Sequence, residues 1–288
     1  MSPVYDCTTE DGRAEGIAKA VEAVREGSVV VLPTDTVYGI GADAFSPEAV
    51  ASVLAAKGRG REMPPPVLVP SVRTVDGLAT EVPSWARDLI REFWPGPLTL
   101  IFKAQSSLMW DLGDTNGTVA VRMPQDDIAL ALLSEVGPMA VTSANLTGQP
   151  PATTVTDAAA QLGAAVTVYL DGGPARGTDV STIVDCTGTS ATILRHGAIS
   201  QEQIDAVLVP AVDVSGAEAD AGADAEADAE LDPEADTDTD TETDTETDTE
   251  TDTESDAAGA PDDAAHEPIE LVGEPNADST SPGETHER

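Results

Sequence analysis

The sequence predicts an α/β (α+β) protein built on a mixed sheet, with a long acidic segment after it. Three observations lead to this fold class. In the first half of the chain, short apolar runs rich in β-branched residues alternate with amphipathic helical patterns, which is typical of strands joined by helices. Further short runs then follow with less helix between them up to about residue 195, so we expect both parallel and antiparallel pairing. Beyond about residue 210 both patterns stop.

The charge of the chain also divides near residue 210. The 288 residues include 53 Asp and Glu against 14 Lys and Arg, a formal net charge of −39. Residues 1–210 hold 25 acids and 13 bases. Their length is enough for one domain with a single core. Residues 211–288 hold 28 acids and one base, Arg288. Because this segment has almost no large apolar residues, we expect a disordered, low-complexity, solvated tail whose deletion leaves the function of residues 1–210 intact.

Composition excludes several classes of protein. No apolar run approaches the roughly 18 to 20 residues of a membrane span, and the first residues lack the pattern of a secretory signal. The two cysteines, Cys7 and Cys186, stand in no cluster of metal ligands, so we expect a reduced cytoplasmic protein that holds no metal of its own. The strong negative charge argues against tight, direct nucleic-acid binding, which depends on Lys and Arg.

Lysine is scarce: Lys19, Lys57 and Lys103 are the only three. Acid-rich, lysine-poor surfaces suit a cytoplasm of high salt, where charges are screened within about 3 Å at 1 M. We therefore hypothesise a halophilic source. A skewed genomic base composition is the alternative explanation.

The first elements follow from apolar spacing. Residues 14–26 carry apolar side chains at helical intervals, and Gly27 follows as a stop signal. The run SVVVL, residues 28–32, predicts a buried strand. The polar, glycine-bearing PTDTVYGIGADAF after it, residues 33–45, predicts a loop.

The next helix has a clear start. Ser46 supplies an N-cap side chain, and a proline and a glutamate follow it in the first turn. Three apolar residues lie on one face of this helix: Val50, Val53 and Leu54. Lys57 lies one turn further along the same face, which places a cation next to buried surface.

The remaining elements alternate at first and are mainly strands later. The expected strands span residues 66–70, 98–102, 118–124, 138–142, 166–170, 181–185 and 191–195. The expected helices span residues 84–94, 126–137 and, more weakly, 156–162. Pro95 stops the first of these helices, and Asp126 is the expected N-cap of the second.

A cationic cluster is the most informative feature for function. Three of the 13 cations of residues 1–210 fall within five positions, at Lys57, Arg59 and Arg61. The glycines between them let the backbone approach a ligand closely, and a guanidinium fork suits phosphate or carboxylate. Cations at a helix C-terminus also complement the helix dipole, so a structural role is the alternative. Because the rest of the sequence is acidic, we favour an anion site.

The strand TVAVRMP contains a second candidate. It places Thr118, Ala120 and Arg122 on one face and apolar residues on the other. An arginine within an apolar strand needs a partner, because burying it unpaired costs free energy. That partner is either an acid of the same chain in an internal salt bridge or the carboxylate or phosphate of a ligand.

A third candidate is the junction after strand 138–142, where Ser143 and Asn145 follow a buried strand. Open α/β sheets bind ligands at the carboxyl ends of their strands, although the same residue types also favour simple turns. The sequence contains neither a GxxxxGK[ST] phosphate loop nor a GxSxG elbow. His196, the only histidine before residue 210, is interpreted as a turn residue, so covalent catalysis is not expected.

Seven short segments carry these features in order: PTDTVYGIGADAF (33–45), KGRGREMPPPVLV (57–69), FWPGPLTLIF (93–102), TVAVRMP (118–124), TSANLTGQP (142–150), LDGGPARGTDVSTIVD (170–185) and ILRHGAIS (193–200). Taken together, about residues 14–208 resemble the YrdC/Sua5 family, the L-threonylcarbamoyladenylate synthases. Each segment alone is a modest signal, and their common order and spacing make the resemblance specific.

The resemblance implies an enzyme that condenses L-threonine, bicarbonate and ATP into threonylcarbamoyl-AMP and pyrophosphate. A downstream threonylcarbamoyltransferase would then pass the threonylcarbamoyl group to N6 of an adenosine in tRNA. The implied fold is a YrdC-like twisted, open mixed sheet with flanking helices and a concave ligand cleft. Mg²⁺ would accompany ATP and bridge its phosphate oxygens, and catalysis would rest on positioning and electrostatic stabilisation.

The resemblance also assigns site residues. The catalytic elements fall on Lys57, Arg59, Ser143 and Asn145. The implied ATP site comprises Lys57, Arg61, Thr118, Ser143, Pro151 and Arg195. The implied L-threonine site comprises Thr34, Arg122, Val141 and Ser181.

This chain departs from the family pattern at Gly60 and over residues 63–66, and an acidic segment stands where longer Sua5 members have a second domain. The main alternative is an RNA-binding module of the same fold without synthase activity, which a salt-dependent affinity for tRNA would distinguish. A carbamoyl-handling domain of hydrogenase maturation proteins shares the fold. Those longer chains carry zinc-finger and acylphosphatase segments that are not visible here.

Overall fold

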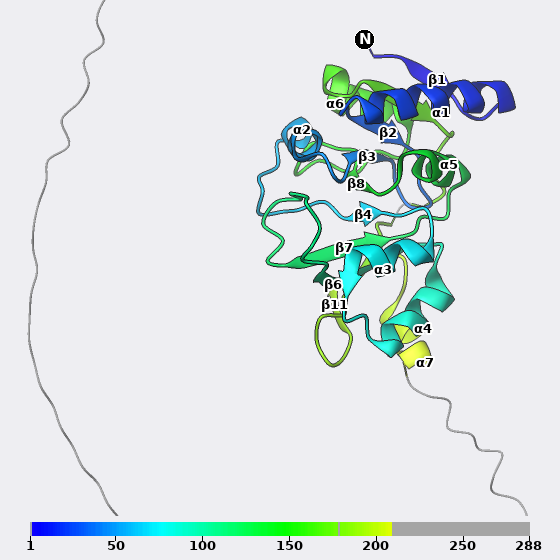
Figure 1. The fold of residues 1–288 in the computed structure, drawn as a ribbon. Helices are drawn as coiled ribbons and strands as arrows, with labels where there is room; N and C mark the ends of the chain where they lie inside the picture. Colours follow the sequence, from blue (N-terminus) through cyan, green and yellow to red (C-terminus); the bar gives the residue numbers. More distant parts are fainter. Residues whose placement is uncertain (1, 178, 209–288) are drawn as a thin grey trace, which may run out of the picture. The chain divides into compact units, whose positions relative to one another are not determined.

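The computed structural model describes residues 2–177 and 179–208 of the chain (Figure 1). The expected acidic tail, residues 211–288, lies outside the described residues, so its disorder stays a prediction. Within the described part, no helix combines the length and the apolar character needed to cross a membrane.

Four of the described helices, α1, α2, α5 and α6, begin at side chains that cap them. The bounds of the helices are α1 Glu10–Arg25, α2 Pro47–Lys57, α3 Val75–Leu78, α4 Ser84–Phe93, α5 Asp127–Val136, α6 Val155–Leu162 and α7 Gln201–Leu208, with short 3₁₀ turns at Val72–Thr74 and Gly163–Ala165. The predicted caps of α2 and α5 are confirmed, because Ser46 accepts from the N–H of Ala49 and Asp126 accepts from two N–H groups of α5. The first helix starts earlier than predicted, because Thr9 caps it.

The strands form one mixed sheet. Their bounds are β1 Val4–Asp6, β2 Val30–Leu32, β3 Gly39–Asp43, β4 Val67–Leu68, β5 Ala79–Thr80, β6 Leu98–Ala104, β7 Thr118–Arg122, β8 Met139–Ser143, β9 Val168–Asp171, β10 Thr182–Asp185 and β11 Thr192–Arg195. The strand order is β1-β9-β2-β3-β8-β4-β7-β6-β10-β11, and β5 pairs with β6. Four pairings are parallel (β1/β9, β2/β9, β4/β7 and β6/β10) and six are antiparallel, which confirms the predicted mixed, open sheet.

The loop predicted over residues 33–45 is wrong in its second half, which forms β3. This strand lies between β2 and β8, with Gly39 opposite Ser143 and Gly41 opposite Val141. A Cβ atom on Gly39 or Gly41 would come within 2.7 Å or 2.5 Å of the Val141 methyl groups. The glycines therefore make room for a close neighbour, where sequence reasoning interpreted them as turn residues.

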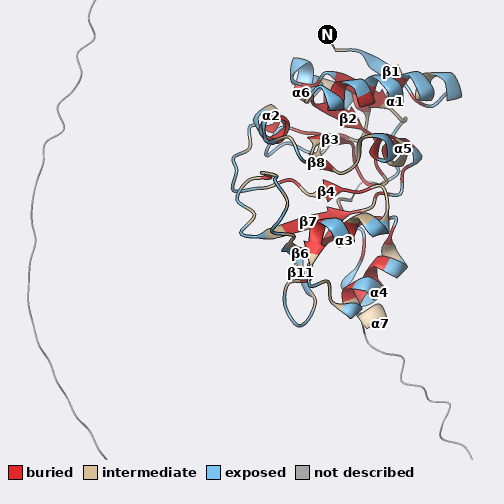
Figure 2. Cartoon of the chain, in the orientation of Figure 1, coloured by how far each residue is buried: buried red, intermediate tan, exposed pale blue. Residues whose placement is uncertain are grey.

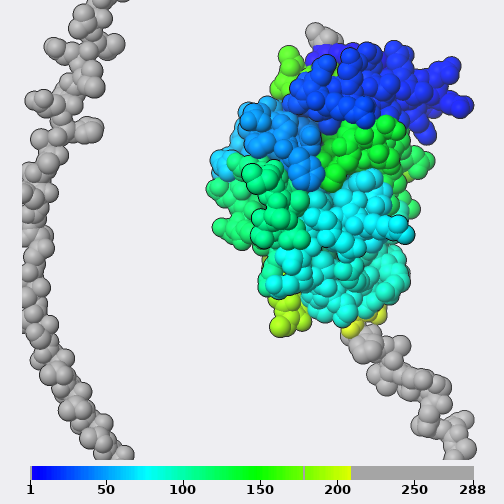
Figure 3. All heavy atoms as spheres, in the orientation of Figure 1, coloured from blue at the N-terminus to red at the C-terminus, as the bar shows by residue number. Residues whose placement is uncertain are grey.

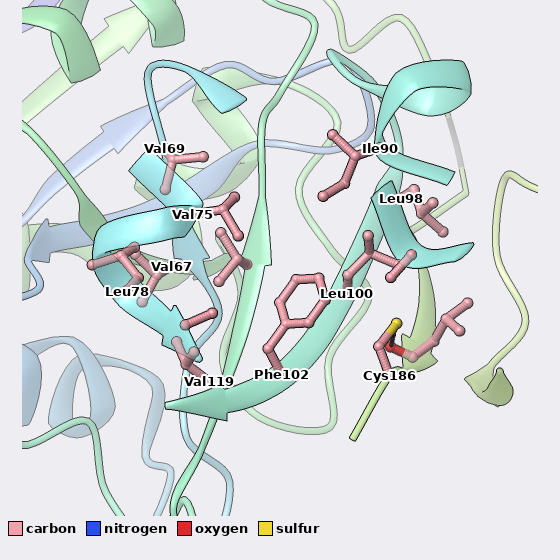
Figure 4. Packing of buried hydrophobic residues seen from close by; sticks show 14 of the residues in the cluster. Val67, Val69, Val75, Leu78, Ile90, Leu98, Leu100, Phe102, Val119 and Cys186 are labelled. Atoms are coloured by element: carbon pink, nitrogen blue, oxygen red, sulfur yellow. Dashed lines mark hydrogen bonds between the residues drawn. The ribbon is translucent and has the colours of Figure 1, made fainter. Parts of the chain in front are cut away.

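Helices cover both faces of the sheet, and buried residues concentrate along its strands (Figure 2). On one face α1 and α5 pack on β2, β8 and β9, and on the other face α2 and α6 pack on β2 and β3. A third cluster joins α3, α4 and α7 to β6 and β7, and Figure 4 shows Phe102 and Leu100 of β6 among its members.

The third cluster uses only one face of the strands that build it. Leu98, Leu100 and Phe102 of β6 point into it, as do Val119 and Val121 of β7. The alternate residues of the same strands therefore face the opposite side. That second side borders a cavity.

Candidate active-site cleft

A cavity of about 590 Å³ lies over the free face of β6, β7 and β10. The end of β8, the strand β11 and the loops before β3 and after α2 complete its walls. Eight of the residues predicted for the site line it: Thr34, Arg59, Thr118, Arg122, Val141, Ser143, Ser181 and Arg195. Four others do not line it: Lys57, Arg61, Asn145 and Pro151. The structure thus brings together two thirds of the predicted set around one volume.

Lys57 lies behind the cavity wall. It is the last residue of α2, only 1% exposed, and Gly58 ends the helix in the left-handed region at φ 61°. Its ammonium donates to the backbone oxygen of Ser143, to the backbone oxygen of Asn145 at 2.7 Å and to Asn145 Oδ1 at 3.2 Å. Burial, and then the nearby charge of Arg59, lower the pKa of Lys57 to about 8. Lys57 therefore fixes the turn that carries Ser143.

Asn145 completes this turn. Its amide nitrogen donates to the backbone oxygens of Leu146 and Gln149, each at 2.8 Å. The N–H of Thr147 donates to the backbone oxygen of Lys57 at 2.9 Å, which joins the turn to the end of α2. Lys57 and Asn145 thus form a support on which Ser143, at the end of β8, presents its half-buried side chain to the cavity.

Arg59 reaches the cavity from the loop after α2. Its Nη1 donates to Thr142 Oγ1 at 3.3 Å, and its buried Nε has no hydrogen-bond partner among residues 2–177 and 179–208. Burial lowers the pKa of Arg59, and the charge of Glu62 opposes that shift. A buried donor without a partner costs free energy, so this guanidinium is suited to an anion that enters the cavity.

Arg195 stands on the opposite wall, in β11. Its Nε and Nη2 donate to the backbone oxygen of Ser181 at 3.0 and 2.8 Å, and Nη2 also donates to Ser181 Oγ at 2.9 Å. Ser181 Oγ in turn lies 2.8 Å from Thr99 Oγ1. Burial lowers the pKa of Arg195, and the charges of Arg122 and Arg59 add to the shift. Arg195 is therefore near enough to both Arg122 and Arg59 for their charges to repel its own.

For Arg122 the sequence left two partners open, an acid of the same chain or a ligand. Arg122 is buried in β7, and its Nη2 donates to Asp35 Oδ1 at 2.6 Å, so the internal salt bridge exists. Its Nε donates to the backbone oxygen of Gly96 at 3.0 Å, and its Nη1 donates to Thr36 Oγ1 at 3.1 Å. Arg122 also lines the cavity, and two of its five N–H groups are not used in these bonds. A structural pair and a ligand contact are thus compatible.

Arg61 lies outside the cavity walls. Its guanidinium donates to both carboxylate oxygens of Asp111, at 2.8 and 3.1 Å, and its Nε lies 3.7 Å from Asp114. These contacts join the loop after α2 to the segment between β6 and β7. In the space-filling view this segment adjoins α2 (Figure 3). Trp110 of the segment stacks on Phe45, with ring centroids 5.6 Å apart.

Sequence reasoning missed several cavity residues. Thr36 and Thr99 line the walls, and Asp35 lies beneath them as the partner of Arg122. The signal was present in the PTDT segment, where three polar residues follow a buried strand, although only Thr34 was selected. Within the described ranges no three His, Cys, Asp or Glu side chains are grouped as a metal site would require. Among the residues that the structure describes, Glu62 is the single acidic side chain on the cavity wall.

The chain that forms this cleft is similar to known proteins. A model of the Sua5/YciO/YrdC family, described as "Telomere recombination", matches residues 22–197. A Mycobacterium leprae protein provisionally named a threonylcarbamoyl-AMP synthase is 56% identical over 213 residues, which is 73% of this chain and 97% of that one. The threonylcarbamoyl-AMP synthase of Bacillus subtilis is 40% identical over 197 residues, 67% of this chain and 57% of that protein.

Solved structures agree. The crystal structure of Pyrococcus abyssi Sua5 complexed with L-threonine matches with a TM-score of 0.69 and 34% identity. The match covers 72% of this chain and 61% of the archaeal one, so this chain corresponds to only part of that longer protein.

Proposed function

This chain belongs to the Sua5/YciO/YrdC family, and we propose on that basis that it is an L-threonylcarbamoyladenylate (threonylcarbamoyl-AMP) synthase. The enzyme would be of the nucleotidyltransferase type, with L-threonine, bicarbonate and ATP as substrates. The observation that carries the proposal is the cavity itself. Two guanidiniums that have no carboxylate within salt-bridge distance among the described residues, Arg59 and Arg195, face a volume large enough for a nucleotide beside a hydroxyl-lined wall.

We assign the cavity residues to two ligands. Arg59, Thr118, Ser143 and Arg195 would contact the nucleotide, and Thr34, Arg122, Val141 and Ser181 would surround L-threonine. Lys57 and Asn145 act as positioning residues, because they hold the Ser143 turn from behind the wall. Arg61 and Pro151 lie outside the cavity walls, so the nucleotide contacts that the resemblance implies for them stay predictions.

The reaction needs no nucleophile from the protein. The ammonium of L-threonine first gives its proton to solvent. The free amino group then attacks the carbon of bicarbonate to form a carbamate, and water leaves. A carbamate oxygen then attacks the α-phosphorus of ATP, the bond from that phosphorus to the β-phosphate oxygen breaks, and pyrophosphate leaves. Negative charge grows on the leaving group, where Arg59 and Arg195 would stabilise it.

Mg²⁺ would enter with ATP as part of the substrate. Glu62, the one wall carboxylate in the described part of the chain, cannot by itself form a protein cage for the ion, whereas ATP phosphates supply the oxygen ligands that Mg²⁺ prefers. Bound in this way, the ion would neutralise phosphate charge during pyrophosphate departure. The described residues thus fit a metal that arrives with the nucleotide.

The product would serve a downstream threonylcarbamoyltransferase that modifies tRNA, in the cytoplasm. The relatives named above are synthases, which favours this function over an RNA-binding module without activity. The halophilic source stays a hypothesis, and it predicts an activity optimum at molar KCl.

The test is pyrophosphate release by the full chain, with L-threonine and bicarbonate each present or omitted, at low and at molar KCl. We expect release that requires both co-substrates. A folded sample that releases no pyrophosphate at either salt would contradict the synthase. Salt-sensitive binding of tRNA by that sample would then favour the alternative.

A further inference from the structure

The three arginines of the cleft differ in how their charges are balanced. Arg59 and Arg195 donate to hydroxyl and carbonyl oxygens, and among the described residues neither has a carboxylate within salt-bridge distance. Arg122 alone is paired with a carboxylate, that of Asp35. The cleft thus has one part in which two guanidiniums lack an ion-pair partner among the described residues, with Glu62 on its wall, and another part in which the ion pair has a net charge of zero.

The pair of Asp35 and Arg122 is closely held. Both side chains are 8% exposed, and the Nη2 to Oδ1 distance is 2.6 Å. Oδ1 also accepts from the N–H of Gln125 at 2.9 Å, which ties Asp35 to the segment that follows β7. Thr36, the next residue, accepts from Nη1 of the same guanidinium. Two consecutive residues therefore set the orientation of Arg122.

The second oxygen of Asp35 shows that stability alone does not explain this residue. Asp35 Oδ2 is buried and has no hydrogen-bond partner in residues 2–177 and 179–208. A buried carboxylate oxygen without a partner costs free energy, and an ion pair at this depth contributes little net stability. The arrangement is better explained by what it does to Arg122.

We propose that Asp35 is a positioning residue that aims Arg122 and cancels its charge, so that this part of the cleft selects a zwitterion over an anion. The proposal rests on the synthase function and names the property by which L-threonine is chosen. L-Threonine carries no net charge, and its ammonium group lies beside the carboxylate that Arg122 would bind. Without Asp35 that ammonium would approach three guanidiniums that lack an ion-pair partner among the described residues, and like charges repel.

The same charge balance explains how ATP and L-threonine can be sorted within one cavity. A phosphate is attracted to Arg59 and Arg195, which lack an ion-pair partner among the described residues. At Arg122 the attraction of an anion is opposed by Asp35, so phosphate gains less there. Asp35 thus keeps the amino-acid part of the cleft from becoming a second phosphate site.

The experiment compares the full chain with Asp35→Asn, which keeps the size of the side chain and removes its charge. The probe is 2,3-dihydroxybutanoate of matching configuration, an anion in which a hydroxyl replaces the amino group of L-threonine. For the variant we expect the KM for L-threonine to rise about 10-fold or more, while the KM for ATP stays within about 2-fold. The inhibition constant of the anion should fall, so that the preference for the zwitterion shrinks about 10-fold or more.

Asp76→Asn is the matched control, because it removes a carboxylate from an exposed arginine, Arg87, at a 3.0 Å contact. This variant should leave both constants unchanged. A merely structural role for Asp35 would lower kcat or thermal stability and leave the preference between zwitterion and anion where it was. That result would overturn the proposal while the synthase function stood.

The wild-type chain provides a test that does not depend on folding of the variant. We expect 2,3-dihydroxybutanoate to compete with L-threonine at least about 10-fold more weakly than L-threonine binds, because the charge-balanced pair gives an anion little advantage. Competition as strong as that of L-threonine would overturn the proposal. Absence of L-threonine-dependent pyrophosphate release from the wild type would be a separate failure, that of the proposed function, and this inference would fall with it.

Discussion

Lys57 and Arg61 lie four residues apart in one cationic cluster, and the fold gives them opposite surroundings. Lys57 ends α2 at 1% exposure and donates to three carbonyl oxygens of the Ser143 turn, and no carboxylate of the described residues is paired with it. The Arg61 side chain is 57% exposed and is paired with Asp111 and Asp114. Between them, Arg59 is half-buried and lines the cavity. The same kind of charge thus supports a turn, faces a ligand volume or joins two loops.

The comparison teaches that the number of charges in a stretch of sequence does not show which of them contacts a ligand. For Lys57 the helix itself predicts a buried position, because this residue continues the buried face formed by Val50, Val53 and Leu54. After Gly58 the helix has ended, and its periodicity no longer predicts where Arg59 and Arg61 point. Tertiary contacts with β8 and with the segment before β7 decide those two.

The largest effect is expected from Lys57→Met, which tests the buried member of the comparison. Removal of the ammonium leaves the oxygens of the Ser143 turn without their donor, at about 1–3 kcal/mol for each group left unpaired. We expect pyrophosphate release to fall about 100-fold or more, since small misplacements of a site are costly. Thermal unfolding should occur at lower temperature. Lys19→Met, at an exposed i,i+3 pair, is the control and should change neither property.

Arg59→Ala tests the member that faces the cavity. Among the described residues the side chain makes one hydrogen bond, at 3.3 Å, so its loss should change the free energy of unfolding by only about 1 kcal/mol. Pyrophosphate release should nevertheless fall about 10- to 100-fold, because a donor aimed at developing negative charge is lost. Steady-state kinetics with an unfolding curve checks both. If the free energy of unfolding fell by as much as the lost activity corresponds to, Arg59 would be a supporting residue like Lys57.

The pH dependence of the rate sharpens the distinction. Burial lowers the pKa of Lys57 to about 8, so its ammonium loses a proton as the pH rises through that value. Above it, a neutral amine presents a lone pair to the carbonyl oxygens that it should bind, and kcat should decline. Lys57→Arg stays charged throughout and should lack this decline. A decline caused by titration of L-threonine itself would appear in both proteins. Identical profiles for both proteins would exclude Lys57 as the titrating group.

The smallest effect is expected from Arg61→Ala. Exposed salt bridges contribute about 0–1 kcal/mol, and Arg61 does not line the cavity. We expect kcat and the KM for ATP to change by less than about 3-fold, since only the attachment of the neighbouring loop is weakened. An increase of 10-fold or more in the KM for ATP would break the comparison. It would restore the nucleotide contact that the family resemblance implies.

Much of the fold could be predicted because it depends on local signals. The caps at Ser46 and Asp126 each act within three residues, and both are where the sequence placed them. The second half of residues 33–45 was missed because a glycine in a loop and a glycine under Val141 look alike without the neighbouring strand. The strand β1 and the helix α7 were also missed, since each is short and depends on packing against distant residues.

The candidate site was predicted in part for the same reason. The alternation of β7 correctly placed Thr118, Ala120 and Arg122 on one face, which lines the cavity. The partner of Arg122 could not be chosen from the sequence, because residues 1–210 contain 25 acids and only the fold brings Asp35 to it. The roles of the individual residues stay predictions for the experiments above.

The position of β1 in the sheet has a consequence for how the chain is made. Val4 of β1 pairs with Tyr169 of β9, so these partners are 165 residues apart. At the roughly 5–20 residues per second of protein synthesis, the residues of β1 are synthesised about 8–33 s before those of β9. Pairing over such distances also slows folding, because a long loop must close before the contact stabilises anything. A ribosome that stalls before β9 would therefore leave the first strand exposed, and protease sensitivity of nascent chains should persist until residue 171 has emerged.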